Sequence, residues 1–319
     1  MNAKNPMTSY QNVESKVSII EKKQNKRLVD KAVRGGISCL GIAVVGLMIL
    51  ITLFLAYRGI QLFTRYHHSL GEFLFSSDWA PNDSMEGGGK VGSAVYFVGS
   101  ILTCGIALLI AAPFSITVSV FISELVPDKT KAFFQMLVEI LAGVPSIIYG
   151  WMGLTILVPW LKEISGRPHG FSVMAGALVL ALMVLPTMIT LCKDSYRSVP
   201  EAQRLAAYGL GATKFQMIKD VILPTAKTGV FTAFVLGLSR AFGEALAVAM
   251  VIGKTRAFPA DLLSPTTNLT SAIASDMGGA MEGGEYNAAL WAMALSLFVI
   301  SLVFVFIIGK IGSRGRVND

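Results

Sequence analysis

A series of long apolar runs constrains this chain more than any other feature, and several approach the ~20 residues that a helix needs to cross a bilayer. Of the 319 residues, 53% are hydrophobic and only 15% are charged, which is too apolar a balance for an ordinary soluble domain. A backbone surrounded by lipid must satisfy its own hydrogen bonds, as an α-helix does. The sequence therefore predicts an all-α integral membrane protein.

The apolar runs predict six membrane-spanning helices. These cover approximately residues 35–57, 92–122, 133–161, 171–192, 229–253 and 287–308. The second and third exceed the minimum length, so we expect them to tilt or to protrude from the bilayer. Pro145 interrupts the third and Pro186 the fourth, and each marks either a kink beside a passage or an adjustment of packing. We divide the chain into a polar extension (1–34), one membrane domain (35–310) and a tail (311–319).

The distribution of basic residues predicts how these helices are oriented. Most of the 27 Lys and Arg fall in the N-terminal region, the second and fourth connections and the C-terminal region. By the positive-inside rule these parts face the cytoplasm, so both termini are predicted to be cytoplasmic. In this setting the net charge of +7 is an orientation signal and not a nucleic-acid-binding face.

The residues that usually carry chemistry are sparse. The three cysteines have no metal-ligand or disulfide spacing, and we interpret them as small membrane-buried residues (Cys39, Cys104 and Cys192). The three histidines lie in external connections without a Cys or carboxylate at ligand spacing, and are predicted to be solvated (His67, His68 and His169). The chain also lacks the G-x-x-x-x-G-K-[ST] motif and any nucleophile constellation. We therefore predict no catalytic residues, no metal, no cofactor and no ATP hydrolysis by this chain.

Residues 201–224, called the elbow below, form a polar, cationic segment between the fourth and fifth apolar runs. The stretch 201–208 contains good helix formers, whereas Gly209 and Gly211 weaken a helix and permit a turn with positive φ. The first helix is expected to present a small, flat apolar surface made by Leu205, Ala206 and Ala207.

A second short helix is predicted after the two glycines. Thr213 and Gln216 have the spacing of a capping box, so this helix should begin at Thr213. It should run to about Ile222 and end before Pro224, which restricts the residue preceding it. Such an elbow fits either a surface on which another protein docks or an interfacial helix that rests on lipid headgroups.

Two ionisable residues, Arg240 and Glu244, lie within the fifth apolar run. A charged side chain at bilayer depth costs on the order of 3 kcal/mol on insertion scales, and such residues are usually functional. The i,i+4 spacing would place both on one helix face, where they can pair. The pair either ties this helix to a neighbour or lines a passage for a charged solute, and we favour the passage.

The chemistry of this pair suggests the solute. Arg240 offers permanent charge and bidentate hydrogen bonding, which suit an oxyanion such as phosphate. Orthophosphate at neutral pH keeps a proton that Glu244 can accept in a hydrogen bond, whereas sulfate would face an unpaired carboxylate. Arg240 can also be the only partner of Glu244, in which case this discrimination does not apply.

The elbow resembles the coupling motif of ABC importer permeases. That motif reads Glu-Ala-Ala, three residues, Gly, nine residues and Ile-x-Leu-Pro, and its matching positions are Leu205, Ala206, Ala207, Gly211, Val221, Leu223 and Pro224. The chain departs from it at Leu205, where glutamate is usual, and conservatively at Val221. The first change removes a carboxylate that could pair with a cation of an ATPase. The resemblance implies that this segment couples the chain to an ATPase subunit.

Other runs are more specific. The stretches 141–150 and 237–253, together with Ser77-Asp78-Trp79, are similar to the C-type permease of bacterial phosphate-specific ABC importers, and the similarity covers roughly residues 35–310. In that family the arginine and glutamate of the matching run are needed for transport, which carries over to Arg240 and Glu244.

The resemblance also implies an architecture and a set of partners. It implies the six-span type I (MetI-like) permease fold in the inner, cytoplasmic membrane. The partners would be a homologous A-type permease, two copies of an ATPase, an external phosphate-binding protein, phosphate and membrane lipid. The chain would then import inorganic phosphate by alternating access. Sulfate or molybdate import, or an ion-coupled secondary transporter with Glu244 as a proton site, are the alternatives.

Overall fold

The computed structural model describes residues 6–315, and describes side chains from residue 33 to residue 310. Contacts divide the chain into two units, residues 1–57 and 58–319. The first unit contains the larger part of helix α1 (Pro6–Thr64), whose remainder belongs to the second unit. Most side chains of the predicted extension 1–34, and residues 316–319 of the predicted tail, lie outside the described part.

Six helical segments of the described chain are long and apolar enough to cross a membrane. They are Val33–Thr64, Ala94–Leu125, Ser146–Ser165, Val173–Arg197, Lys214–Gly243 and Glu285–Lys310. The number of predicted spans is confirmed, and the third and the fifth of them need corrected limits.

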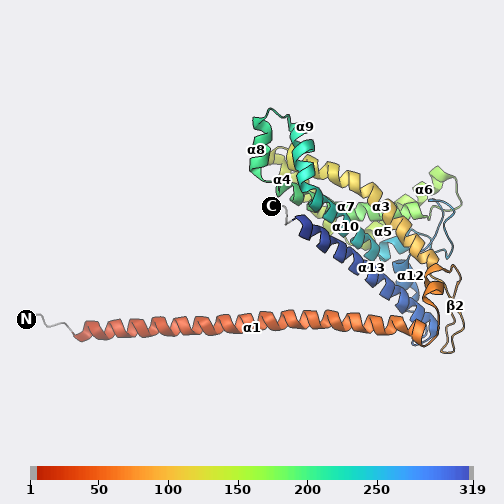
Figure 1. Cartoon of the computed structure of the whole chain (residues 1–319), viewed down its shortest axis with the longest axis horizontal. Helices are drawn as coiled ribbons and strands as arrows, with labels where there is room; N and C mark the ends of the chain where they lie inside the picture. Colours follow the sequence, from red (N-terminus) through yellow and green to blue (C-terminus); the bar gives the residue numbers. More distant parts are fainter. Residues whose placement is uncertain (1–5, 316–319) are drawn as a thin grey trace, which may run out of the picture. The chain divides into compact units, whose positions relative to one another are not determined.

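The second unit is built almost entirely from helices. Its longer helices are α3 (Ala94–Val120), α4 (Asp128–Gly143), α7 (Val173–Arg197), α10 (Leu223–Gly243) and α13 (Glu285–Gly315). Its shorter helices are α2 (Leu70–Phe75), α5 (Ser146–Met152), α6 (Val158–Ser165), α8 (Glu201–Gly209), α9 (Lys214–Gln216), α11 (Leu246–Ala249) and α12 (Leu269–Asp276). The π-helical turns are η1 (Phe121–Leu125), η2 (Gly153–Leu157) and η3 (Met217–Ile222), and a two-stranded antiparallel ribbon pairs β1 (Trp79–Ala80) with β2 (Lys90–Val91). Figure 1 shows α8 and α9 at one end of this unit and α12 and β2 at the other.

Helix α7 forms the centre of the second unit, since it is the most buried of the six segments that can span a membrane. It packs against α3 and α10 in a core that includes Ala107, Leu180 and Phe242. Small residues allow the helix backbones to approach closely, as is usual in membranes. A Cβ at Gly237 of α10 would lie 2.8 Å from the Met188 side chain of α7. This packing holds the elbow and Arg240 on one continuous scaffold.

The predicted third span is divided, which corrects its limits. Helix α4 ends at Gly143, Val144 is extended with ψ 125°, and α5 begins at Ser146 after Pro145. Pro145 disfavours helical geometry at the residue before it and has no N–H for the carbonyl of Leu141, four residues back. The hydroxyl of Tyr149 donates to that carbonyl at 2.7 Å. The break is therefore satisfied locally, and the segment able to span begins only at Ser146.

The fifth span begins earlier and ends earlier than predicted. The sequence suggested a helix end before Pro224, yet the helical segment continues from Lys214 to Gly243. The turn η3 is wider than an α-helical turn, and the N–H of Leu223 donates to Ile218, five residues back. This wider turn accommodates the proline ring that would clash with a carbonyl in a regular helix. The predicted limit at residue 253 is also wrong, because α10 stops at Gly243.

A buried carboxylate organises the end of the unit opposite the elbow. The side chain of Glu285 is 0% exposed and accepts hydrogen bonds from the backbone N–H groups of Asn82, Gly88 and Gly89 at 2.7–2.9 Å. His68 approaches it with Nε2 at 2.7 Å. This cluster fastens the connection after α1 to the first turn of α13.

The prediction of three solvated histidines is wrong for one of them. His67 and His169 are exposed, whereas the His68 side chain is only 10% exposed and also contacts Glu72 at 3.1 Å. Burial acts to lower the pKa of His68, but the hydrogen bonds to Glu285 and Glu72 outweigh it and raise the pKa above its ordinary value of 6.5. His68 and Glu285 are 217 residues apart, so no local pattern could have linked them.

We expect this cluster to lose stability as the pH rises. Because the pKa of His68 is raised in the folded protein, its contribution is complete below the unfolded value of 6.5 and is lost as the pH passes the folded value. The melting temperature of the purified protein should therefore fall over this range, and His68→Gln should remove that pH-dependent step. His67→Gln is the matched control and should keep it. An identical pH profile for His68→Gln and the unmodified protein would contradict the assignment.

Candidate coupling and translocation site

The elbow begins with α8 and turns at Gly211. The N–H of Ala212 donates to the carbonyl of Ala207, and the N–H of Gly211 donates to that of Tyr208, each at 3.0 Å. These two bonds form a Schellman motif. The φ of Gly211 is +82°, which glycine adopts readily and other residues avoid. The predicted glycine turn is confirmed at Gly211, while Gly209 is the last residue of α8.

The second helix of the elbow starts where the capping box predicted. The Oγ1 of Thr213 accepts from the N–H of Gln216 at 3.3 Å, and the Gln216 side chain accepts from the N–H of Thr213 at 2.8 Å. Both halves of the box are present, so α9 has a defined first turn. Two short helices thus meet at a fixed angle, and the second continues through η3 into α10.

The elbow exposes only part of the predicted apolar surface. Leu205 is 62% exposed and Ala206 is also exposed, but Ala207 is 8% exposed and packs in a cluster with Tyr196 and Ile222. This difference arises because neighbouring residues of a helix point in different directions. Ala207 therefore supports the elbow from within, and cannot contribute to an outer surface.

Two large apolar side chains extend the exposed surface of the elbow. Leu210 is 91% exposed in the turn, and Phe215 is 71% exposed on α9. Neither belongs to a motif, so sequence reasoning did not select them. Of the three remaining motif positions, Val221 and Leu223 are half-buried and Pro224 is exposed. With Leu205, three large apolar side chains of the elbow are thus exposed in the single chain and available to another protein or to lipid.

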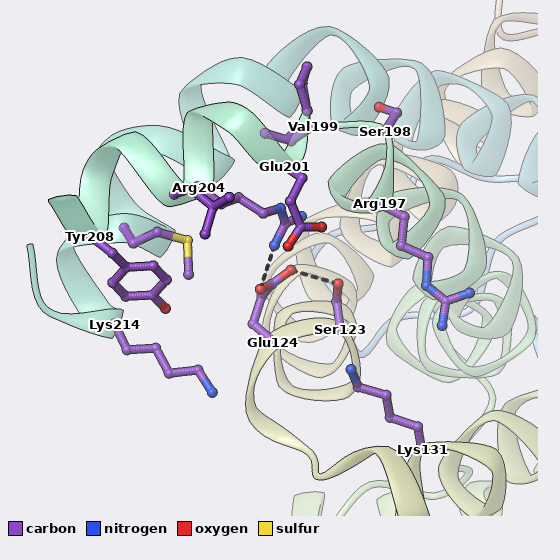
Figure 2. Close-up of a pocket in the computed structure, with 13 residues that line it drawn as sticks. Ser123, Glu124, Lys131, Arg197, Ser198, Val199, Glu201, Arg204, Tyr208 and Lys214 are labelled. Carbon is purple, nitrogen blue, oxygen red and sulfur yellow. Dashed lines mark hydrogen bonds and ion pairs between the residues drawn. The ribbon is translucent and has the colours of Figure 1, made fainter.

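A buried ion pair fixes α8 to the end of the second span. Arg204 donates from Nη1 to Glu124 Oε2 at 2.8 Å and from Nη2 to the carbonyl of Tyr196 at 2.6 Å. Ser123 donates to the other oxygen of Glu124 at 2.8 Å, as Figure 2 shows. The side chains of Arg204 and Glu124 are 18% and 7% exposed, so their attraction is poorly screened by water. The two residues are 80 apart in sequence, and no local signal could have paired them.

A groove of about 570 Å³ lies between the elbow and the loop that joins α3 to α4. Its charged lining residues are Glu124, Lys131, Arg197, Glu201, Arg204 and Lys214, and Figure 2 shows them around one opening. We call it the elbow groove. Four of these side chains are cationic and two are carboxylates, so the groove has an excess of positive charge. Leu205, Tyr208 and Met217 add apolar surface on the elbow side.

The predicted pair of Arg240 and Glu244 is not formed on one helix face, which corrects that expectation. Arg240 lies in the last turn of α10, is exposed in this single chain and donates to the hydroxyl of Thr187 on α7. Glu244 follows the helix end and has extended geometry, with φ −79° and ψ 124°. Its Oε1 accepts from the N–H of Ala247 at 3.2 Å, and its carbonyl accepts from the Thr270 hydroxyl at 2.7 Å. The i,i+4 rule fails because the helix stops at Gly243.

The structure brings three features of separate spans close together. Tyr149, whose hydroxyl closes the proline break between α4 and α5, lies within electrostatic range of Arg240 without a hydrogen bond between them. Thr187, which holds the guanidinium of Arg240, directly follows Pro186 in α7. An exposed guanidinium in an apolar helix is costly against lipid, so this face needs a polar passage or another subunit beside it.

Comparison with known proteins shows which family this chain belongs to. Residues 111–317, which include the elbow and Arg240, match the model of the binding-protein-dependent transport system inner membrane component. The chain belongs to this family. It is 37% identical to a probable ABC transporter permease protein, YqgH, of Bacillus subtilis, over 98% of this chain and 100% of that protein. It is 35% identical to the phosphate transport system permease protein PstC of Haemophilus influenzae, over 72% of this chain and 77% of that one.

Solved structures agree with the fold of this ABC permease. A MetNI methionine ABC transporter chain superposes with a TM-score of 0.53 at 19% identity, covering 68% of this chain and 93% of that one. A chain of a bacterial alginate ABC transporter superposes with a TM-score of 0.56 at 17% identity, covering 86% of this chain and 94% of that one. The predicted MetI-like fold and the multi-pass location in the inner membrane are confirmed. The roles of Arg240, Glu244 and the elbow residues stay predictions.

Proposed function

We propose that this chain is the membrane-spanning subunit of an ATP-driven importer of inorganic phosphate. The observation that carries the proposal is Arg240, an exposed guanidinium in an apolar span, in a chain whose relatives include phosphate transport permeases. Membership of the ABC permease family supplies the architecture, and the relatives supply the substrate class. The proposed orientation places both termini and the elbow in the cytoplasm, in agreement with the positive-inside rule.

The proposed assembly contains two permeases, two ATPases and an external phosphate-binding protein. A homologous A-type permease would lie beside the face that exposes Arg240, because that face cannot remain against lipid. The cytoplasmic ATPases would hydrolyse ATP and engage the exposed elbow residues Leu205, Leu210 and Phe215. Their closure would move the elbow, and the continuous helix from Lys214 to Gly243 would carry that displacement to Arg240. The two states of alternating access then differ in the side from which phosphate reaches Arg240.

The two ionisable residues have separate roles in this proposal. Arg240 compensates the charge of phosphate with several N–H donors, and Thr187 holds its side chain in place. One carboxylate oxygen of Glu244 accepts from the N–H of Ala247 in α11, and its second oxygen is available to a proton carried by phosphate. Sulfate has no such proton at neutral pH and would meet carboxylate repulsion instead.

Uptake by the reconstituted complex tests the proposal. Phosphate uptake should require ATP, the ATPase and the binding protein, and excess sulfate or molybdate should leave it unchanged. Equal competition by sulfate would overturn the phosphate assignment and favour another oxyanion. Loss of uptake on collapse of the membrane potential, with ATP held constant, would overturn the ATP-driven mechanism and favour a secondary transporter.

A further inference from the structure

The elbow groove has charged residues that the coupling motif does not explain. Arg204 is neutralised by Glu124 within the groove, and Lys131 pairs with Asp128 at 2.9 Å on its rim. Within the described part of the chain, Arg197 and Lys214 have no ion-pair partner. They come from different elements, the last turn of α7 and the first turn of α9.

The remaining charge of the groove favours an anionic occupant. Apart from the two ion pairs, Arg197 and Lys214 oppose a single carboxylate, Glu201, so an excess of positive charge remains. The helix that lines the groove has Leu205 where the coupling motif usually has a glutamate. The surface presented to a docking protein is therefore cationic and apolar, and lacks the carboxylate expected from the motif.

The dimensions of the groove favour a peptide segment over a single small anion. Its volume of about 570 Å³ has room for several side chains. The lining combines cations with the apolar surfaces of Leu205, Tyr208 and Met217, which a hydrated oxyanion would not use. An extended segment with acidic side chains beside an apolar one satisfies both parts of the lining.

We propose that the elbow groove receives an acidic segment of the cytoplasmic ATPase. This inference rests on the proposed function, because it assumes that an ATPase docks on the elbow. Arg197 and Lys214 attract Asp or Glu side chains of the segment, and Leu205 and Tyr208 pack against its apolar residue. The ATPase of this importer thus carries negative charge at the position that faces α7 and α9.

An occupied groove gives the ATPase two mechanical connections to the membrane helices. One wall of the groove is the elbow, which continues into α10. The opposite wall is η1 and the start of α4, and the Glu124–Arg204 pair joins the two walls. A segment bound between them moves α3 together with α10, whereas a contact on the elbow surface alone would act mainly on α10.

Charge reversal in the assembled complex tests this inference. The complex is purified in a neutral detergent through a tag on this chain, and the retained ATPase is measured at low and high ionic strength. Arg197→Glu and Lys214→Glu should each lower ATPase affinity about tenfold at low salt, with a smaller difference at high salt. Lys219→Glu is the matched control, because it makes the same change of charge on an exposed residue of η3 outside the groove.

The same variants separate the inference from misfolding and from failure of the proposed function. Lys214 is the first residue of α9, where a carboxylate favours the helix dipole, so Lys214→Glu should not unfold the elbow. If the unmodified complex retains ATPase and both variants retain it as well as Lys219→Glu does, the inference is wrong. If the unmodified complex retains no ATPase, the proposed function itself is wrong, and this result is distinct from the failure of the groove alone.

A photo-crosslinker at position 214 identifies the occupant directly. We expect it to label a peptide of the ATPase that is rich in Asp or Glu. Labelling of lipid alone, or of the other permease, would contradict the proposal.

Discussion

Replacing Arg240 with Gln is expected to lower phosphate uptake by at least about a hundredfold while the complex still assembles, an effect comparable to the loss of one preorganised charge-stabilising donor. Gln keeps hydrogen-bonding capacity but removes the permanent charge that compensates phosphate. The side chain is exposed in the single chain, so the substitution leaves no cavity in the helix core. The initial rate of phosphate uptake into proteoliposomes measures the effect, and co-purification of the subunits measures assembly.

Thr187→Val is the control that separates a role in transport from a structural role. Arg240 makes one hydrogen bond to Thr187 across α10 and α7, and a purely structural arginine would act through that bond. Val has the shape of Thr without the hydroxyl, so it removes the bond and keeps the charge. We expect most of the uptake to survive in Thr187→Val. Equal loss in both variants, or full uptake with Gln at position 240, would remove Arg240 from the phosphate pathway.

The sequence predicted features whose causes are local. The capping box of Thr213 and Gln216 depends on residues three apart, and the turn at Gly211 depends on the backbone freedom of one residue. Both are present in the structure. The number of spans was also predictable, because each apolar run independently satisfies the length that a membrane requires.

Two prolines show that the same local rule can hold at one position and fail at another. Pro224 was expected to end a helix and Pro145 to interrupt a continuing span. Pro145 does interrupt the helix, because Val144 becomes extended before it, whereas the wide turn η3 accommodates Pro224 and the helix continues. A proline removes the same hydrogen bond at both positions, so the outcome depends on whether the preceding turn can widen.

The candidate site was predicted only where its residues lie near one another in sequence. The coupling motif selected Leu205 and Gly211, but Arg204 and Glu124 pair across 80 residues and carry no recognisable spacing. The expected Arg240–Glu244 pair assumed that the helix continues beyond Gly243, which it does not. Tertiary packing therefore decides which charges meet.

Gly211→Pro is expected to uncouple ATP hydrolysis from phosphate uptake. Proline fixes φ near −65°, whereas Gly211 has φ +82°. Proline also removes the N–H that donates to the carbonyl of Tyr208. The Schellman motif would be lost, so α8 and α9 would no longer keep their angle. We expect ATPase activity to persist at its basal rate without stimulation by the loaded binding protein. ATP consumed per phosphate imported, measured in proteoliposomes, quantifies the loss.

Two alanine variants isolate the backbone conformation from every other effect. A Cβ at Gly209 or at Gly211 would meet nothing within 4 Å, so alanine would contact no neighbouring residue at either position. Gly209 ends α8 without a positive φ, whereas Gly211 would force alanine into the left-handed region at a cost of about 1–2 kcal/mol. Gly209→Ala should therefore keep full coupling, and Gly211→Ala should lose part of it. Normal coupling in both Gly211 variants would mean that the angle of the elbow does not transmit force, because these substitutions alter that angle and spare the docking side chains.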